Sequence, residues 1–246
     1  MANEIVDPLN TEQAPARELV VFFLIDTSGS MAGDRIGAVN SAVEEAIPEM
    51  RNIGGSDSII KFAPLTFGLG VKWIWPNGPE PVETATWNRL PADGMTPMGA
   101  AFRELNVKLS KTGFLKRPSM SFSPVIFLLT DGFPNDDWNS GLELLKKNTW
   151  FKNALRIGVG IGDDADMDMI KKFVKDPELA IRLKDGRQLK DMIQFILITS
   201  SQIGSSSIGF DSGEPSDDDN AAKTQTMVDK LKGKMDSDYF DQKNGF

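Results

Sequence analysis

Five oxygen-bearing side chains are distributed over three separate stretches of the sequence. Asp26, Ser28 and Ser30 stand in the motif DTSGS, Thr96 lies in the turn-rich stretch PADGMTPM, and Asp131 stands in TDG. Two carboxylates and three hydroxyls suit a hard divalent cation, Mg²⁺ first and Mn²⁺ or Ca²⁺ as related choices, rather than zinc or copper. The chemistry that this set predicts is cation binding.

The spacing of the first motif allows its polar side chains to meet at one point. Alternate residues of Asp26-x-Ser28-x-Ser30 can turn inward from a single loop, and Gly29 permits the tight bend. Mg²⁺ takes about six oxygen ligands and gives up its waters reluctantly. Five protein groups, some acting through water, would leave a coordination position for a further ligand.

Each acidic motif directly follows a wholly apolar segment of strand length. The segments 19–25 and 125–129 lack polar residues, which indicates central strands covered on both faces. We expect an α/β fold with a doubly wound, mostly parallel six-stranded sheet in the order 3-2-1-4-5-6, one antiparallel edge strand and helices on both faces. Strands 1 and 4 are then neighbours where the strand order reverses, so Asp26 and Asp131 would face one crevice.

The other elements are predicted from hydrophobic periodicity and from turn residues. Thr96 and Pro97 suit the start of a helix, with threonine as the cap and proline in the first turn. We expect strands over 19–25, 58–67, 71–75, 125–129, 155–161 and 180–183, and helices over 35–50, 86–90, 98–110, 140–151, 167–175 and 186–203.

A simpler interpretation of the three motifs needs no metal. Ser28 and Ser30 would cap the following helix, and Asp131 would begin a turn with Gly132 and Pro134. We favour the cation site, because capping does not explain why all the motifs fall at one edge of the sheet.

Two further acidic clusters follow strands at the same edge of the predicted sheet. They are 136–137 and 163–166. We expect solvated loops there, with Asp166 capping the next helix, and a second cation site is the alternative.

The composition excludes several classes of site. The 246 residues include no histidine and no cysteine, so histidine-based catalytic relays, zinc fingers, disulfides and iron–sulfur clusters are excluded. A net charge of −8 argues against general nucleic-acid binding, because phosphate backbones need a basic surface. The apolar runs are too short to span a bilayer, and the polar, acidic start lacks the pattern of a signal peptide. We expect a cytoplasmic protein that binds neither nucleic acid nor a membrane.

The five residues, with the order of strands and helices around them, resemble a von Willebrand factor type A (vWA) domain with a complete metal-ion-dependent adhesion site (MIDAS). The resemblance implies that the two serines and the threonine coordinate the ion directly or through water, while the aspartates act largely through water. It also implies a cation that remains able to bind an acidic side chain of a protein partner. We expect the vWA domain over 18–203, after an N-terminal extension over 1–17.

The motifs DTSGSM and LLTDGFPND look most similar, within this family, to those of bacterial tellurium-resistance-associated, TerY-like proteins. That likeness implies association with a protein kinase and a phosphatase in a phosphorylation-linked stress or defence system. Cytoplasmic members that pair with AAA+ ATPases are the neighbouring alternative.

We expect a binding module and not an enzyme. The alternative is a metal-dependent phosphoryl hydrolase with Asp26 as the nucleophile. Against it, the familiar arrangement of paired aspartates needs a second carboxylate two residues further on, where this chain has Ser28.

One position departs from the family pattern. Many members have a second glycine before the metal-loop threonine, where this chain has Met95. Methionine removes no ligand there, and it narrows the rim or adds an apolar contact. A soft collar formed by Met31, Met95 and Met98 is one hypothesis, and core filling is the more common use of methionine.

The composition changes after Gly204. Residues 211–246 contain 9 Asp or Glu and 5 Lys or Arg, so this short segment carries half of the net charge. We expect 204–246 to be an acidic, flexible tail. Met227, Leu231 and Met235 recur every four residues, so a short amphipathic helix that docks on a partner is the alternative.

Overall fold

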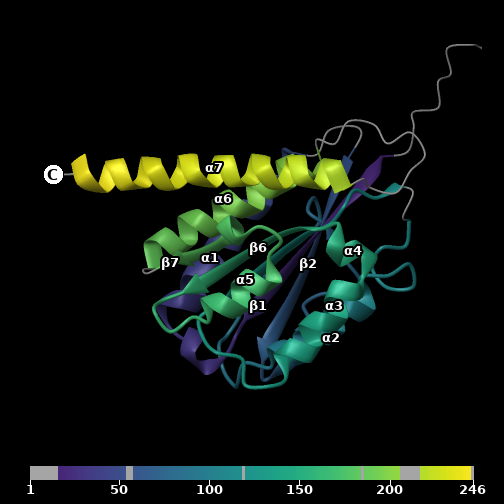
Figure 1. Cartoon of the computed structure of the whole chain (residues 1–246), viewed down its shortest axis with the longest axis horizontal. Coiled ribbons are helices and arrows are strands. Elements are labelled where there is room, and N and C mark those ends of the chain that lie inside the picture. The colour runs from purple at the N-terminus through teal and green to yellow at the C-terminus, as the bar shows by residue number, and fades with distance from the viewer. Residues whose placement is uncertain (1–15, 54–57, 118–119, 184–185, 206–216, 245–246) are drawn as a thin grey trace, which may run out of the picture.

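The computed structural model describes residues 16–53, 58–117, 120–183, 186–205 and 217–244, and strands and helices alternate along most of this part of the chain (Figure 1). Almost all of the expected N-terminal extension, 1–15, lies outside the described residues. The strands are β1 (Arg17–Asp26), β2 (Ser58–Gly68), β3 (Gly70–Trp73), β4 (Glu80–Pro81), β5 (Val125–Thr130), β6 (Leu155–Ile161) and β7 (Ala180–Leu183). The helices are η1 (Gly29–Met31), α1 (Asp34–Arg51), α2 (Met98–Lys108), α3 (Trp138–Lys147), α4 (Thr149–Lys152), α5 (Met167–Phe173), η3 (Pro177–Leu179), α6 (Gly186–Ser205) and α7 (Asp217–Asn244).

The strands form one sheet in the order β3-β2-β1-β5-β6-β7. Numbered as the six predicted strands, this is the predicted order 3-2-1-4-5-6. The pairs β1–β2, β1–β5, β5–β6 and β6–β7 are parallel, and β3 pairs antiparallel with β2. The predicted α/β fold is therefore confirmed, with one addition, because the two-residue β4 also pairs antiparallel with β2.

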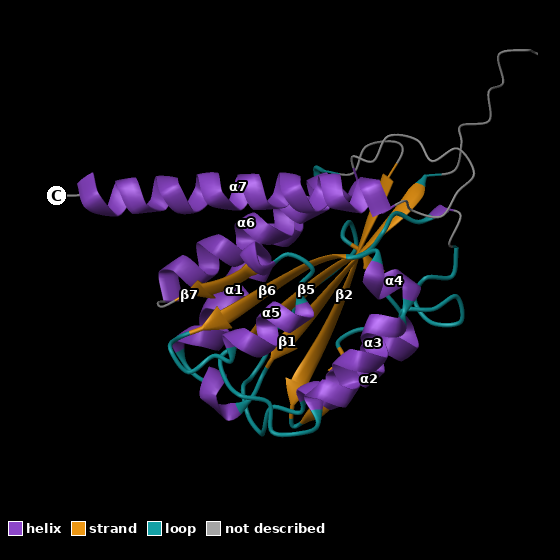
Figure 2. Cartoon of the chain, in the orientation of Figure 1, coloured by secondary structure: helices purple, strands orange, loops and turns teal. Residues whose placement is uncertain are grey.

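Helices cover both faces of the sheet (Figure 2). Neighbouring residues of β1 show this, since successive side chains of a strand point to opposite faces. Phe23 stacks on Phe127 of β5 with ring centroids 4.6 Å apart, on the face covered by α1 and α6. Phe22 packs on Trp73, whose indole nitrogen donates a 2.7 Å hydrogen bond to Glu104 of α2 on the other face. Burial on both sides explains the uninterrupted apolar sequence of β1.

The register of the central strands brings both acidic motifs to one edge. Ile25 of β1 lies opposite Leu129 of β5. Asp26 and Asp131 follow these residues by one and two positions, so both lie at the carboxyl ends of adjacent parallel strands. The loops that follow the strands gather along the lower edge of the molecule in Figure 2.

Residues 86–90 do not form the expected helix, and they are irregular. The side chain of Asn40, on α1, fixes this segment from outside. Its Oδ1 accepts hydrogen bonds from the backbone N–H of Leu90 at 2.7 Å and from the indole N–H of Trp87 at 3.0 Å, and its Nδ2 donates to the carbonyl oxygen of Leu90 at 3.0 Å. Hydrogen bonds to a distant side chain thus replace those of a helix turn.

The helix expected over 140–151 is two helices, α3 and α4, separated at Asn148. The Asn148 side chain accepts hydrogen bonds from the N–H groups of Trp150 and Phe151, which caps the start of α4. Asparagine is favoured at such a cap because its side chain satisfies free N–H groups.

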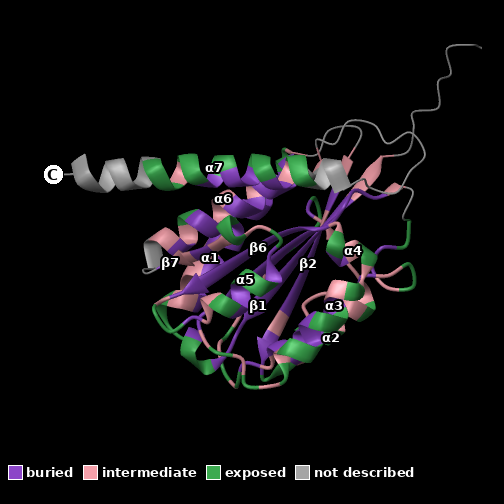
Figure 3. Cartoon of the chain, viewed as in Figure 1, coloured by how far each residue is buried: buried purple, intermediate pink, exposed green. Residues whose placement is uncertain are grey.

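The C-terminal segment forms a helix over Asp217–Asn244, where we expected an acidic, flexible tail. Met227, Val228 and Leu231 are buried where α7 runs alongside α6 (Figure 3). The alternative of an amphipathic helix was closer, although Met235 is 48% exposed. Residues 206–216 lie outside the described part of the chain.

No helix in the described part of the chain combines the length and the apolar character that a membrane crossing requires.

Candidate functional site

Backbone hydrogen bonds tie together the three loops that carry the predicted ligands. The N–H of Gly29 donates to the carbonyl oxygen of Gly94 at 3.1 Å, and the N–H of Asp93 donates to the carbonyl oxygen of Thr27 at 2.8 Å. The N–H of Asn135 donates to the carbonyl oxygen of Thr96 at 3.1 Å. The loop that contains Thr96 is therefore fastened to the other two.

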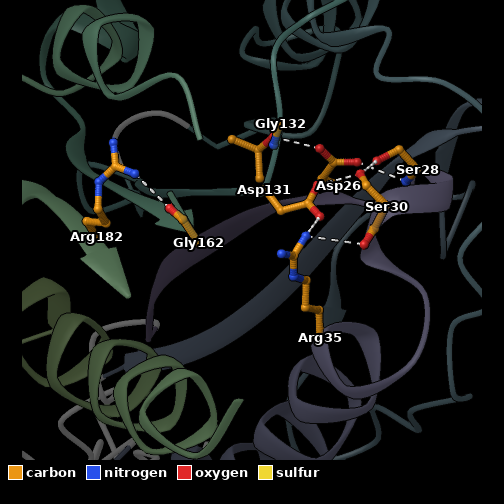
Figure 4. A network of polar contacts seen from close by, with 9 residues as sticks. Asp26, Ser28, Ser30, Arg35, Asp131, Gly132, Gly162 and Arg182 are labelled. Atoms are coloured by element: carbon orange, nitrogen blue, oxygen red, sulfur yellow. Dashed lines mark hydrogen bonds and ion pairs between the residues drawn. The ribbon is translucent and has the colours of Figure 1, made fainter. Parts of the chain in front are cut away.

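Side-chain oxygens from the first and third loops are in direct contact (Figure 4). The hydroxyls of Ser28 and Ser30 lie 3.1 Å apart, and the Ser30 hydroxyl donates to Oδ1 of Asp131 at 2.8 Å. Ser30 and Asp131 are 101 positions apart in the chain. The structure thus brings together four of the five predicted residues, Asp26, Ser28, Ser30 and Asp131.

Asp26 is fully buried, and both of its carboxylate oxygens are engaged. Oδ1 accepts from the N–H of Ser28 at 2.8 Å, and Oδ2 accepts from the hydroxyl of Thr130 at 2.6 Å. Burial raises the pKa of the Asp26 carboxyl, the hydrogen bonds from Ser28 and Thr130 oppose this, and the nearby charge of Asp131 adds to it. Asp26 therefore holds the start of the loop in place through these two hydrogen bonds. A cation bound nearby would favour the ionised form of its carboxyl.

Thr96 is held next to the loop that follows β5 by its backbone carbonyl oxygen, which accepts the hydrogen bond from Asn135. Its side chain is buried at 8% exposure, and among the described residues no group forms a hydrogen bond to its hydroxyl. The expected role of Thr96 as the cap of α2 is wrong. Oxygens of Asp136 instead accept from the N–H groups of Gly99 and Ala100, at 2.7 and 2.8 Å. The Thr96 hydroxyl is thereby left available as a ligand.

The interpretation of the serines as helix caps is also not supported. Ser28 precedes η1 without a side-chain capping hydrogen bond, and Gly33 precedes α1. The hydroxyls of Ser28 and Ser30 bond instead to each other and to Asp131.

Arg35, in the first turn of α1, is a site residue that the sequence analysis missed. Its guanidinium donates to Oδ2 of Asp131, and the same nitrogen lies 3.3 Å from the carbonyl oxygen of Ser30. Its side chain is 37% exposed, whereas that of Asp131 is fully buried. A positive charge thus already sits beside the predicted cation site.

The loop after β6 borders Arg35. A Cβ built on Gly162, which has φ of +79°, would lie 3.2 Å from a guanidinium nitrogen of Arg35. Arg182 holds this loop by donating to the carbonyl oxygen of Gly162 at 2.7 Å (Figure 4) and to those of Asp163 and Ala165 at 2.8 and 3.2 Å.

Part of each acidic cluster has a structural role. Asp166 caps α5 by accepting from the N–H of Met169, as predicted, and Asp137 caps α3. Within the described residues no group of three or more acidic side chains is arranged to hold a metal ion. A second cation site therefore gains no support.

The collar of methionines is wrong for two of its three members. Met31 and Met98 are fully buried in the core, and Met95 alone is exposed, at 62%. Core filling explains the first two.

The donor set fits a hard divalent cation, since every nearby candidate ligand is an oxygen and three of the five predicted ligands are hydroxyls. A family model for the von Willebrand factor type A domain matches residues 21–195. The chain belongs to the vWA domain family. Domains of this family are typically metal-dependent protein-interaction modules, with the metal held at the MIDAS.

Solved structures share the fold of this vWA domain at low sequence identity. A von Willebrand factor type A protein from Catenulispora acidiphila is 19% identical with a TM-score of 0.55, over 76% of this chain and 43% of its own. Proximal thread matrix protein 1 from the mussel byssus is 16% identical with a TM-score of 0.56, over 77% of this chain and 47% of its own. The manganese-loaded TRAP protein of Plasmodium vivax is 17% identical with a TM-score of 0.52, over 74% of each chain.

This chain covers less than half of the length of the first two of these proteins, and the rest of each of them lies outside the aligned region. A comparison with curated proteins finds no match. Thread matrix protein 1 has also been solved with zinc in its MIDAS motif, which, with the manganese-loaded protein, shows that this fold holds divalent metals.

Proposed function

We propose that this vWA domain is a protein-interaction module that holds a divalent cation, Mg²⁺ first and Mn²⁺ or Ca²⁺ as alternatives, and binds an acidic side chain of a protein partner through it. The observation that carries the proposal is the contact of Ser28, Ser30 and Asp131 at 3.1 and 2.8 Å, made by residues from two loops. A random surface cluster would not combine this contact with a fully buried aspartate two residues before Ser28 and with backbone hydrogen bonds from both loops to the loop of Thr96.

The five residues have distinct roles in this proposal. The hydroxyls of Ser28, Ser30 and Thr96 are the ligands, and Asp131 supplies negative charge beside them. Asp26 fixes the loop, since both its oxygens are already bonded to protein groups. The cation, when bound, supplies Lewis acidity that an anionic ligand can satisfy.

Phosphoryl hydrolysis is disfavoured by the same geometry. A nucleophilic carboxylate must expose an oxygen to the phosphorus atom. Asp26 is fully buried, and its two oxygens accept hydrogen bonds from Ser28 and Thr130.

The cellular setting is a finer part of the proposal. The motifs DTSGSM and LLTDGFPND support a TerY-like role in the cytoplasm, in which the partner is a protein kinase or a phosphatase of a stress or defence system. An AAA+ ATPase is the alternative partner. Identification of proteins that co-purify only in the presence of Mg²⁺ distinguishes these two.

Cation binding is tested by titrating the metal-free protein with Mn²⁺ and Mg²⁺ in a calorimeter. Wild type is expected to bind one ion, and Ser28→Ala with Ser30→Ala is expected to weaken binding at least tenfold while the circular dichroism spectrum is unchanged. Ser140→Ala, an exposed serine of α3, is the matched control. Equal affinity of the double variant and wild type would overturn the proposed ligands.

Partner binding is tested with the same proteins. A partner captured in Mg²⁺ is expected to be released by EDTA and to be absent from captures on the double serine variant. Full retention after chelation would contradict a metal-mediated contact.

A further inference from the structure

The loops around the site carry unusually exposed apolar side chains. The described residues include six exposed large hydrophobic side chains, and three of them are in loops that hold or border the predicted ligands. These are Leu69 at 71%, Met95 at 62% and Phe133 at 66% exposure. Large apolar side chains exposed on neighbouring loops commonly mark a surface for another protein. We call these three residues the apolar rim.

The loops of the apolar rim are in contact through their backbones. A Cβ built on Gly94 would lie 2.6 Å from the backbone nitrogen of Leu69, so the loop after β2 touches the residue that precedes Met95. The N–H of Asn135 donates to the carbonyl oxygen of Thr96, which joins the loop of Phe133 to the residue that follows Met95. The three side chains therefore come from loops that meet along residues 94–96.

The rim is also held in place before any partner binds. Gly94 has φ of +91°, and both this conformation and its close approach to Leu69 favour glycine. Asp136 fixes the start of α2 by accepting from the N–H groups of Gly99 and Ala100, three and four residues after Thr96. Pre-organised loops lose little conformational freedom on binding, so apolar contacts made there contribute to affinity.

Charge at the site restricts the kind of partner. Arg35 is paired with Asp131, and with the proposed metal bound the positive charges of the metal and Arg35 outnumber the negative charges of Asp131 and Asp26, in a chain with a net charge of −8. The metal and Arg35 would therefore attract a negatively charged group, whereas the apolar rim on the neighbouring loops offers contacts for apolar groups.

We propose that the apolar rim of Leu69, Met95 and Phe133 recognises a peptide segment in which the metal-binding Asp or Glu is flanked by apolar side chains. This inference rests on the proposed function and specifies the chemistry of its partner. The acidic side chain of the peptide binds the metal, and its apolar neighbours pack on the apolar rim. A peptide with polar neighbours would leave the rim exposed to water and would therefore bind more weakly.

The test uses the full chain and a displayed library of nine-residue peptides with a central glutamate and random flanks. Peptides are selected in Mg²⁺ and eluted with EDTA. Wild type is expected to enrich apolar residues within two positions of the glutamate at least fivefold over the unselected library. The variant Leu69→Ser, Met95→Ser, Phe133→Ser is expected to lose this enrichment and to retain metal affinity in the calorimeter.

The control variant is Val107→Ser with Leu144→Ser. These residues are exposed at 60% and 43%, and they lie on α2 and α3 outside the three loops. The control is expected to select the same peptides as wild type. Loss of apolar enrichment in the control as well would show a non-specific effect of surface hydrophobicity and would overturn the assignment to the rim.

The other outcomes separate the two proposals. EDTA-eluted peptides without apolar flanks, from a protein that binds Mg²⁺, overturn the role of the rim and leave the metal site standing. Apolar peptides that remain bound after chelation indicate a surface independent of the metal and overturn the combined recognition. A protein that binds no cation and enriches no peptide on metal elution contradicts the proposed function, and the rim proposal falls with it.

Discussion

Arg35 forms an ion pair with Asp131, the buried carboxylate that also accepts a hydrogen bond from Ser30. Both oxygens of Asp131 are therefore engaged by protein groups, one by a hydroxyl and the other by a guanidinium. A cation bound beside Asp131 would meet the positive charge of Arg35 at close range. A bound cation would therefore compete with Arg35 for this carboxylate, and we expect the competition to lower the affinity of the site for the metal.

Arg35→Gln is expected to strengthen Mn²⁺ and Mg²⁺ binding. Removing the competing charge should favour the metal by about 1 kcal/mol, or roughly fivefold, since the side chain of Arg35 is partly exposed and its charge is screened. Calorimetric titration measures the change. Arg89→Gln, which removes an exposed arginine paired with Glu44 on α1, is the matched control and should leave the metal affinity unchanged. Weaker binding by Arg35→Gln would show that Arg35 supports the ligands instead of competing with the metal.

Asp136→Ala is expected to lower both stability and metal affinity. Its carboxylate satisfies two N–H groups at the start of α2, and their loss should cost about 1–2 kcal/mol in the free energy of unfolding. The same loss frees the segment that carries Thr96, so the affinity for Mn²⁺ should fall several-fold. Urea unfolding and calorimetry measure the two effects.

Asp137→Ala provides the comparison for this variant. Asp137 caps α3 by accepting from the N–H of Ser140, and among the described residues its carboxylate forms no hydrogen bond to α2. It should also lower the stability of the protein but leave the metal affinity unchanged. If both variants weaken metal binding equally, the loss reflects general destabilisation.

Asn40→Ala is expected to loosen the irregular segment before the Thr96 loop. The side chain of Asn40 makes three hydrogen bonds, to both backbone groups of Leu90 and to the indole of Trp87. Their partners would be left unsatisfied, which should reduce the free energy of unfolding by about 2–3 kcal/mol. Thermal unfolding measures this, and a red shift of tryptophan fluorescence reports the exposure of Trp87. Asn88→Ala, at an exposed position of the same segment, should change neither.

The parts of the fold that could be predicted are those whose pattern is set by burial along the chain. The apolar runs 19–25 and 125–129 had to be central strands, and the strand order then placed Asp26 and Asp131 at one edge. The strand β6 has the predicted bounds, 155–161, for the same reason. Proximity of these motifs is thus a consequence of sequence patterns that can be recognised without a structure.

The parts that could not be predicted depend on contacts with distant residues. The segment 86–90 has helix-compatible residues, but Asn40 supplies its hydrogen bonds from α1. Arg35 was expected on a helix, yet its pairing with Asp131 depends on a side-chain direction that periodicity does not specify. Thr96 was placed in the right loop and given the wrong capping role, because the carboxylate of Asp136 comes from another loop.

The packing of the C-terminal helix α7 also depends on contacts with residues that are distant in the sequence. The acidic composition of 211–246 suggested a segment without a sizeable apolar face, whereas Met227, Val228 and Leu231 are buried against the rest of the chain. Lys232 adds a 2.8 Å ion pair with Glu178, at the surface, where such pairs contribute little.

A chain that ends at Ser205 is therefore expected to be less stable. Burial of these three apolar side chains stabilises the fold by several kcal/mol, and the conformational entropy that α7 loses on folding offsets part of this. We therefore expect the truncated chain to lose about 2–4 kcal/mol in the free energy of unfolding. Tm should fall by roughly 5–10 °C in differential scanning calorimetry. A chain that ends at Lys234 keeps the three buried residues and removes Met235, which is half exposed, so its Tm should stay close to that of the full chain. An unchanged Tm for the shorter chain would show that α7 contributes nothing to the stability of the domain, because burial of its apolar residues would then be balanced by the entropy of ordering them.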